Sequence, residues 1–180
     1  MTNEYALSLA RRGKFAGLTE TLLHTPSKSD ENWRNKILTV HAIEAYKHLH
    51  GLPNEFKTFT NMCMSKEFKP QCAPVFTNMS VVYPADAKDL IVQAESHVHK
   101  ESNKQIIQLN KALYTKSLPL INKVIGNTTD MYTLAQALAI KGILKKNKFL
   151  TEKGIELLFK MGCISDIIWL RQEIENNKKR

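Results

Sequence analysis

The feature that most constrains this sequence is one long run of apolar residues at helical spacing, bounded at both ends by start and stop signals. Between residues 30 and 50 the apolar side chains recur every three or four positions, at Trp33, Ile37, Val40, Ile43 and Tyr46. The preceding Ser27-Lys-Ser-Asp has the spacing of an N-terminal capping box. Gly51 suits the residue after a helix, and Pro53 prevents continuation. The run therefore predicts a long amphipathic helix with one face buried.

Similar signals predict helices along most of the remaining chain. Thr2 or Asn3 caps a first helix, Asn127-Thr-Thr-Asp130 starts a helix that ends near Gly142, and Thr151 caps the next one. The last five residues form a polar tail that we expect to fray. The fold class we predict is all-α, an irregular bundle of eight or nine helices with no sheet. The expected helices cover about residues 2–12, 18–24, 30–50, 54–63, 84–100, 105–125 (split at Pro119), 130–142, 151–161 and 165–175.

Residues 69–84 interrupt this helical pattern, because they contain three prolines in sixteen residues. Proline removes a backbone donor and clashes with the preceding turn, so the segment predicts an extended connector. Its Val-Val-Tyr triplet at 81–83 is the one candidate strand. We expect an N-terminal helical lobe over residues 1–68 and a C-terminal lobe over 85–180, with one continuous domain as the alternative.

Cysteine use and hydropathy favour a reducing compartment, which we take as the cytoplasm or the nucleus. A chain of 180 residues buries enough surface to fold without disulfides or metals. The cysteines are odd in number, and no N-terminal apolar run marks secretion. No stretch is long and apolar enough to cross a membrane. We expect Cys63 and Cys163 to be buried as small apolar residues.

The sequence contains two candidate constellations, and neither meets a known chemical spacing. Cys63 and Cys72 with His97 and His99 have the residue types of a zinc site, but no Cys-x₂₋₄-Cys pair occurs. Two histidines at i and i+2 on a helix also point about 200° apart. We therefore predict no metal and no cofactor.

His41, Glu44 and His48 lie at i, i+3 and i+7, so they share one helix face. The two imidazoles are two turns apart, about 10 Å, and we expect a solvated polar face rather than a site. No phosphate-binding glycine loop or nucleophile elbow occurs. We predict a protein that is not an enzyme, with an unrecognised helical enzyme as the least favoured alternative.

The charge of the chain is strongly uneven. The net charge is +9, and residues 141–180 hold ten basic against five acidic side chains, whereas residues 51–100 are neutral. The excess includes 21 lysines against 5 arginines. Lysine is a point charge that suits diffuse attraction to phosphates, whereas arginine suits bidentate reading. Richness in Lys and Asn is also typical of AT-rich genomes, including those of many viruses.

These charges predict a non-enzymatic nucleic-acid-binding protein that contacts phosphates, with RNA favoured. A nucleocapsid-like or regulatory accessory factor, viral among other sources, has this profile. The segments around residues 141–160 have the outline of a helix-turn-helix, with a turn of about eight residues that is too long for it. The alternative is a helical adaptor that binds an acidic or other protein surface or forms a homo-oligomer. The predicted phosphate-contacting residues are Arg11, Arg12, Lys14, Lys141, Lys145, Lys146, Lys148 and Lys153.

Overall fold

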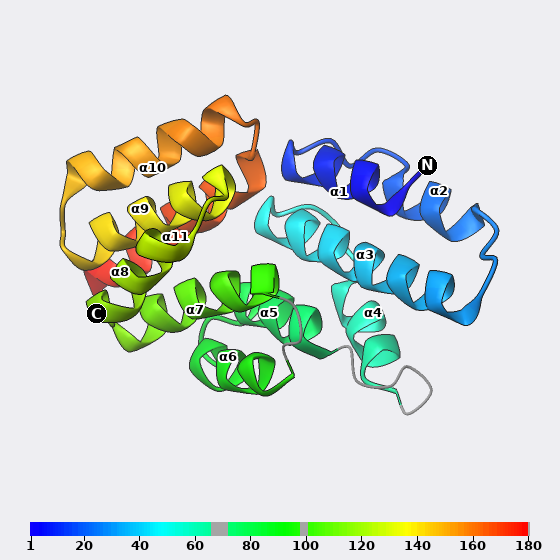
Figure 1. Ribbon diagram of the computed structural model, residues 1–180. Coiled ribbons are helices and arrows are strands. Elements are labelled where there is room, and N and C mark those ends of the chain that lie inside the picture. The colour runs from blue at the N-terminus through cyan, green and yellow to red at the C-terminus, as the bar shows by residue number, and fades with distance from the viewer. Residues whose placement is uncertain (66–71, 98–100, 180) are drawn as a thin grey trace.

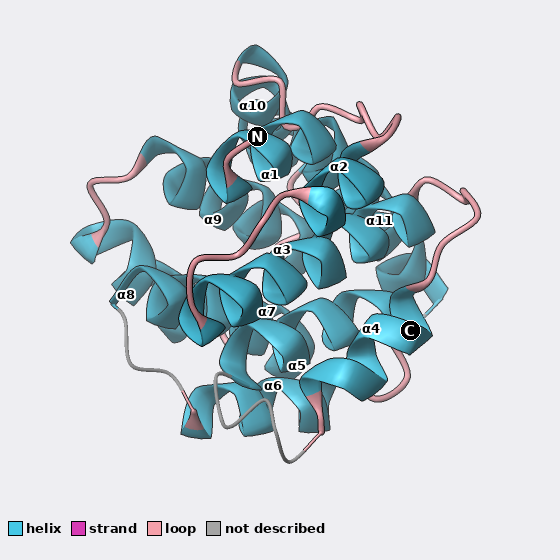
Figure 2. Cartoon of the chain, turned by 90° about the vertical axis from the view of Figure 1, so that its right-hand side faces the viewer, coloured by secondary structure: helices cyan, strands magenta, loops and turns pink. Residues whose placement is uncertain are grey.

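The computed structural model describes residues 1–65, 72–97 and 101–179, without the side chains at 72 and 101–103. Over these residues the chain is all-helical, and Figure 2 shows helices joined by loops with no strand among the described parts. The predicted fold class is confirmed, with eleven helices within these described ranges in place of the expected eight or nine. They are α1 (Asn3–Arg11), α2 (Leu18–His24), α3 (Asp30–Leu49), α4 (Phe56–Cys63), α5 (Cys72–Val82), α6 (Ala87–Ser96), α7 (Glu101–Thr115), α8 (Leu118–Asn127), α9 (Met131–Leu144), α10 (Lys148–Lys160) and α11 (Ile164–Lys179).

Helix α3 is the central element of the N-terminal half. It packs against α1 and α2 on one side and against α4 and α5 on the other (Figure 1). Its apolar residues Ile37, Val40 and Ile43 are fully buried in one cluster with Ala6 and Ala10 of α1. Because neighbours cover α3 on several sides, polar residues of this helix are buried as well.

The C-terminal helices α7 to α11 surround the largest apolar cluster. It includes Leu109, Ile121, Ile140, Leu158 and Leu170, all with 0% exposure. Cys63 and Cys163 are buried, as predicted. Burying a side chain of this size contributes roughly 1.5–3 kcal/mol, so this cluster holds the helices that carry the basic residues in fixed positions.

The predicted extended connector is wrong over its described part, because α5 forms at Cys72–Val82. Pro74 is the third residue of α5, where a backbone N–H has no partner within the helix in any case. The candidate strand at 81–83 is also wrong, since Val81 and Val82 belong to α5. Residues 69–71 lie outside the described residues. Helix α5 packs closely on α6 and also contacts α3.

Helices from the two predicted lobes contact one another. Ser165, at the start of α11, donates a hydrogen bond to the carbonyl oxygen of Ala10 in α1 at 2.8 Å. The Ser165 hydroxyl also lies 2.9 Å from Nε2 of His50, which follows α3. The division into lobes at 1–68 and 85–180 stays a prediction. Among the described residues, none of the helices has the length and apolar composition needed to cross a bilayer.

The helix ends differ in part from those that the local sequence signals predict. Thr2 caps α1 as predicted, because its hydroxyl accepts from the backbone N–H of Tyr5 at 3.2 Å. The cap of α3 is Ser29 rather than Ser27, accepting from Asn32 N–H at 3.2 Å. The C-terminal tail is helical over its described part, since α11 continues to Lys179, and its expected fraying stays a prediction.

Candidate nucleic-acid interface

The basic segment around residue 145 is a tight turn between α9 and α10. Helix α9 ends at Leu144, and Lys146 has a φ of 53°, in the left-handed region. The N–H of Asn147 donates to the carbonyl of Gly142 at 2.8 Å, which closes the end of α9 as in a Schellman motif. The Asn147 side chain then accepts from the N–H of Leu150 at 3.1 Å and caps α10. Residues 145–147 therefore both close the end of α9 and lead into the start of α10.

This geometry corrects two sequence predictions. The turn is three residues long rather than eight, and Thr151 lies inside α10 instead of capping it. The misleading signal was Gly142, which we expected to end α9. Gly142 is instead buried within α9, where a Cβ would lie 2.4 Å from the backbone nitrogen of Thr151. Glycine is present there because α10 approaches so closely.

Helices α9 and α10 form an antiparallel hairpin. Gly142 near the end of α9 faces Thr151 near the start of α10, while Gly154 faces Ala135 and Ala139 further back along α9. A Cβ on Gly154 would lie 2.5 Å from backbone atoms of both alanines. Such backbone contact along both helices differs from the helix-turn-helix outline, in which the helices cross at about 90–120°.

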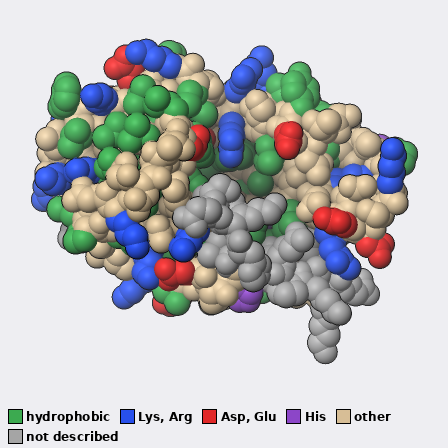
Figure 3. Space-filling model, in the orientation of Figure 1, with side chains coloured by type: hydrophobic (Ala, Val, Ile, Leu, Met, Phe, Trp, Pro, Cys, Tyr) green, Lys and Arg blue, Asp and Glu red, His purple; other side chains and the backbone are tan. Residues whose placement is uncertain are grey.

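Lysines gather where this hairpin turns. Lys145, Lys146 and Lys148 are exposed, and Lys141 is half-buried one turn earlier. Figure 3 shows Lys and Arg side chains at the left edge of the molecule, over the end where α9 and α10 meet. These four residues are the part of the predicted set that the structure brings together.

The C-terminus of α11 adds lysines that the sequence prediction missed. The Asn177 side chain donates to the carbonyl of Ile143 at 3.3 Å, which places the last turn of α11 beside the end of α9. Lys178 and Lys179 are exposed on that turn. Lys178 pairs with Glu175 at 2.6 Å, but both side chains are more than 60% exposed, so this pair neutralises little. We call Lys141, Lys145, Lys146, Lys148, Lys178 and Lys179 the lysine end.

Helix dipoles account for only part of the lysine end. Lys141 and Lys145 lie at the carboxyl end of α9 and Lys179 at that of α11, where positive charge is favourable. Lys148, in contrast, is the first residue of α10, where the partial charge of the helix is positive. Lys146 occupies a left-handed position that glycine or asparagine usually takes. Two of the lysines are therefore placed against local preference.

The other predicted residues lie elsewhere. Arg12 packs against Gly162, just beyond the far end of α10, with Lys14 exposed nearby in sequence. Because α10 has 13 residues, this second basic group is about 20 Å from the lysine end. Lys153 is exposed midway along α10. The structure therefore divides the eight predicted residues into separate groups.

Arg11 belongs to an internal polar cluster and is only partly accessible. Its guanidinium lies 4.8 Å from the ring centre of Tyr132. Burial lowers the pKa of Arg11, but interactions with Tyr132, Tyr46 and Asp166 outweigh this and raise it, so the side chain stays charged. Asp166 accepts from Tyr132 at 2.8 Å; burial raises its pKa, and Arg11 opposes that rise. The interactions among these four side chains join α1, α3, α9 and α11.

A cleft lies beside this cluster, between α1 and the turn that joins α10 to α11. It measures about 370 Å³ and is lined in part by Glu4, Ser8, Arg11, Arg12 and Cys163. Figure 3 shows the surface hollowed between the C-terminal helices on the left and the N-terminal helices on the right. Burial raises the pKa of the Cys163 thiol, which keeps it protonated and poorly nucleophilic near neutral pH.

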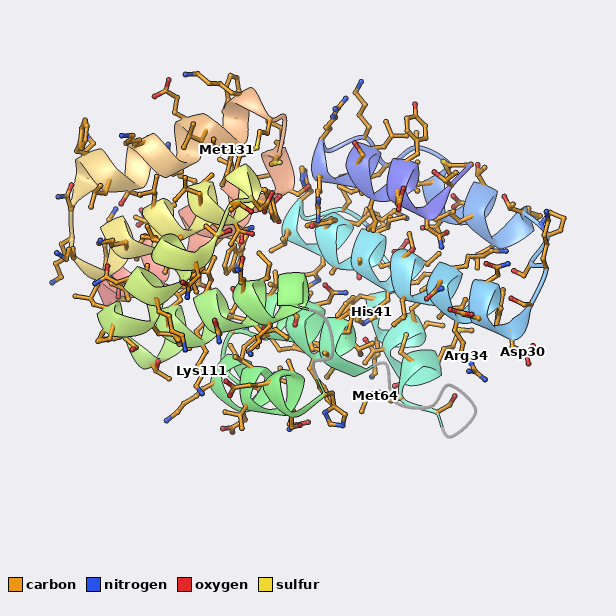
Figure 4. The ribbon with its side chains drawn as sticks, in the orientation of Figure 1. Asp30, Arg34, His41, Met64, Lys111 and Met131 are labelled. Carbon is orange, nitrogen blue, oxygen red and sulfur yellow. The ribbon has the colours of Figure 1, made fainter. Side chains whose placement is uncertain are left out.

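The histidine constellation of α3 differs from the expected solvated face. His41 and Glu44 are 0% and 1% exposed, and only His48 is exposed. The error arose because α4 and α5 cover this side of α3, and Figure 4 shows His41 between α3 and α4.

The partners of His41 define its protonation. Thr60 donates its hydroxyl hydrogen to the carbonyl of Phe56 at 2.8 Å, so its oxygen accepts from Nε2–H of His41 at 3.0 Å. Asn78 Nδ2 donates to Nδ1 of His41 at 3.1 Å. The imidazole is therefore neutral, and burial lowers its pKa to about 4.

Glu44 is a structural carboxylate in the same helix. It accepts from the Thr19 hydroxyl at 2.6 Å, from Lys47 Nζ at 2.8 Å and from the backbone N–H of Glu55 at 2.8 Å. These bonds connect α3 to α2 and to the segment before α4. No group of three or more His, Cys, Asp and Glu side chains is placed to hold a metal ion within the described residues. Of the four Cys and His residues considered as a zinc set, His99 and the side chain of Cys72 lie outside the described residues.

Comparison of the chain with protein-family models, with curated proteins and with solved structures finds no match.

Proposed function

We propose that this chain is a non-enzymatic protein that binds nucleic acid, RNA in preference, through phosphate contacts at the lysine end. The observation that carries the proposal is that lysines from the end of α9, the start of α10 and the end of α11 converge on one end of the molecule. Beside them, Glu175 forms an exposed ion pair with Lys178. Exposed lysines attract phosphates and release condensed counterions whatever the base sequence.

The local strain in the turn also supports this proposal. Lys146 and Lys148 stand where glycine and an acidic residue would make the two helix ends more stable. Residues in locally unfavourable conformations are often found at functional sites. The antiparallel packing of α9 and α10 differs from a helix-turn-helix, so phosphate contact rather than base reading is what we propose.

The test is the salt dependence of binding to a fluorescent single-stranded RNA of about twenty nucleotides, followed by anisotropy. For about five phosphate contacts on a single strand, affinity should fall ~100-fold between 50 and 200 mM salt. Replacing Lys145, Lys146 and Lys148 together by Gln should reduce the slope of log Kd against log salt by about 2. A flat salt response refutes the proposal, and a DNA strand of equal length tests the preference for RNA.

A matched control separates the lysine end from net charge alone. Lys57, Lys88 and Lys123 are exposed on α4, α6 and α8, so their replacement by Gln removes the same total charge elsewhere. This triple variant should bind nearly as well as the wild type. If it loses as much affinity as the lysine-end variant, the attraction is diffuse and the proposed site is wrong.

One single substitution should raise the stability of the fold and weaken RNA binding. Lys146→Gly relieves the left-handed backbone and should stabilise the fold by up to about 1 kcal/mol. If Lys146 contacts phosphate, the same change should also weaken RNA binding severalfold. Stabilisation with unchanged affinity would remove Lys146 from the site.

The alternative function, a protein–protein adaptor, also has one specific observation in its favour. Phe149 and Phe159 of α10 are 74% and 66% exposed. Large apolar side chains exposed in this way often mark association surfaces. An adaptor predicts that the lysine-end variant keeps its protein partner and that the purified wild type carries no nucleic acid.

A further inference from the structure

The outward face of α10 exposes two large apolar side chains. Phe149 and Phe159 are the two most exposed large hydrophobic side chains there. The opposite side of α10 packs on α9 through Thr151 and Gly154, so α10 lies at the edge of the molecule (Figure 1). Both phenylalanines line a groove of about 720 Å³ that also includes Ile155 and Ile167. We call this surface the α10 groove.

The charges of the α10 groove are balanced, unlike those of the whole chain. Its lining contains Glu152 and Glu156 together with Lys153 and Arg171. Arg171 binds Glu152 through two bonds of 3.0 and 3.1 Å across the groove. Glu156 pairs with Lys160 at 2.6 Å. A strongly acidic or basic partner therefore finds little net charge to recognise at this groove.

A second copy of the chain is the partner that this charge balance suits. Two copies carry +9 each and repel one another over most of their surfaces. The repulsion is smallest where the local charge is zero and apolar side chains are exposed. Both conditions are met at the α10 groove.

The residue order along α10 is also symmetric about Gly154. Phe149 and Phe159 are each five positions from it, and Glu152 and Glu156 are each two positions from it. A two-fold axis at the level of Gly154 would place Phe149 of one copy opposite Phe159 of the other. In a closed two-fold interface the same patch of both copies meets, so each residue toward one end of α10 faces a residue toward the other end.

We propose that the chain forms a two-fold homodimer through the α10 groove, with the α10 helices of the two copies packed antiparallel. Burying both rings removes roughly 300 Å² of apolar surface per copy, a large share of the ~800 Å² per partner in a standard interface. The glutamates that approach one another are already paired with cations of their own chain. Lys148 of the lysine end immediately precedes Phe149, so it borders the interface and comes level with Lys160 of the other copy.

Sedimentation equilibrium of the purified, nucleic-acid-free chain tests the proposal. We expect a monomer–dimer equilibrium, with the dissociation constant raised at least about tenfold by Phe149→Ser or by Phe159→Ser. Val92 is 53% exposed on α6, far along the chain, and Val92→Ser is the matched control that should leave the dimer unchanged. A wild type that stays monomeric at several hundred micromolar, or phenylalanine variants that dimerise as tightly, would overturn the proposal.

Salt separates this proposal from the nucleic-acid one. Dimerisation of two positively charged copies should strengthen or stay constant as salt screens their repulsion, whereas RNA binding should weaken. Circular dichroism of each variant shows that it is folded; both rings are exposed in the single chain, so neither substitution should lower the melting temperature of the monomer. The orientation is tested by mixing Phe149→Cys and Phe159→Cys chains with a short bis-maleimide. Antiparallel packing predicts cross-links between unlike variants above the wild-type background, and cross-links only between like variants would refute it.

Discussion

Acidification should destabilise this protein through the buried imidazole of His41. The side chain is fully buried and neutral, because Nε2–H donates to Thr60 and Nδ1 accepts from Asn78. A second proton on Nδ1 would face the Asn78 amide hydrogens. Burial accordingly lowers the pKa of His41 from 6.5 to about 4 in the folded chain.

The sign and size of the effect follow from proton linkage. Above pH 6.5 the imidazole is neutral in both states and the pH has no effect through it. Below 6.5 the unfolded chain takes up a proton that the folded chain refuses, so the free energy of unfolding falls. With the pKa values of 6.5 and about 4, the loss is about 2 kcal/mol at pH 5 and about 3 kcal/mol at pH 4. Below pH 4 the folded state is protonated too, and the loss levels off.

Urea unfolding at about pH 7.5, 6, 5 and 4 measures this loss directly. His41→Gln retains an amide donor and a carbonyl acceptor without a titrating group, so its stability should depend less on pH by the amounts above. Exposed His48, on the same helix, provides the control: His48→Gln should keep the wild-type pH dependence. Equal slopes for the wild type and His41→Gln would refute the reasoning.

Other buried groups make the comparison of variants necessary. Burial also lowers the pKa of His50, which adds to the loss in acid. Burial raises the pKa of Asp166, which acts in the opposite direction because the folded state then binds a proton more readily as the pH falls. These contributions are shared by the wild type and the His41 variant, so they cancel in the difference.

Two further predictions concern packing and buried charge, and unfolding free energies measure both. Gly154→Ala places a Cβ 2.5 Å from backbone atoms of α9, so it should destabilise the fold by about 3 kcal/mol. The control Gly126→Ala in α8 meets nothing within 4 Å and should be neutral or stabilising by about 0.5–1 kcal/mol. Similar destabilisation by both substitutions would contradict the close approach of α9 and α10. Glu44→Ala leaves a buried hydroxyl and a backbone N–H without their acceptor and should cost about 3 kcal/mol, against less than about 1 kcal/mol for Glu175→Ala in its exposed pair.

The local signals in the sequence were sufficient to predict helices wherever the governing interactions lie within a few residues. The cap at Thr2, the start at Asp130 and the split before Pro119 each depend on one turn of chain, and each appears in the structure. The same start, stop and spacing signals along the chain predicted the all-α class. Local signals misled where a residue had a long-range role. Gly142 looked like a helix end but is a contact point between two helices, and Pro74 sits harmlessly in the first turn of α5.

The candidate site divides in the same way. The sequence by itself determined that positive charge collects in the last forty residues, because the charged residues can be counted along the chain without knowing the fold. Only the tertiary structure brought Lys178 and Lys179 beside the α9–α10 turn, moved Arg11 into an internal cluster, and left Phe149 and Phe159 on an outer face. The burial of His41 and Glu44 was decided there too, since the separate helices α2, α4 and α5 fold back to cover α3. The physical reason is common to all of these: burial and proximity depend on which helices pack together, and no local pattern encodes that packing.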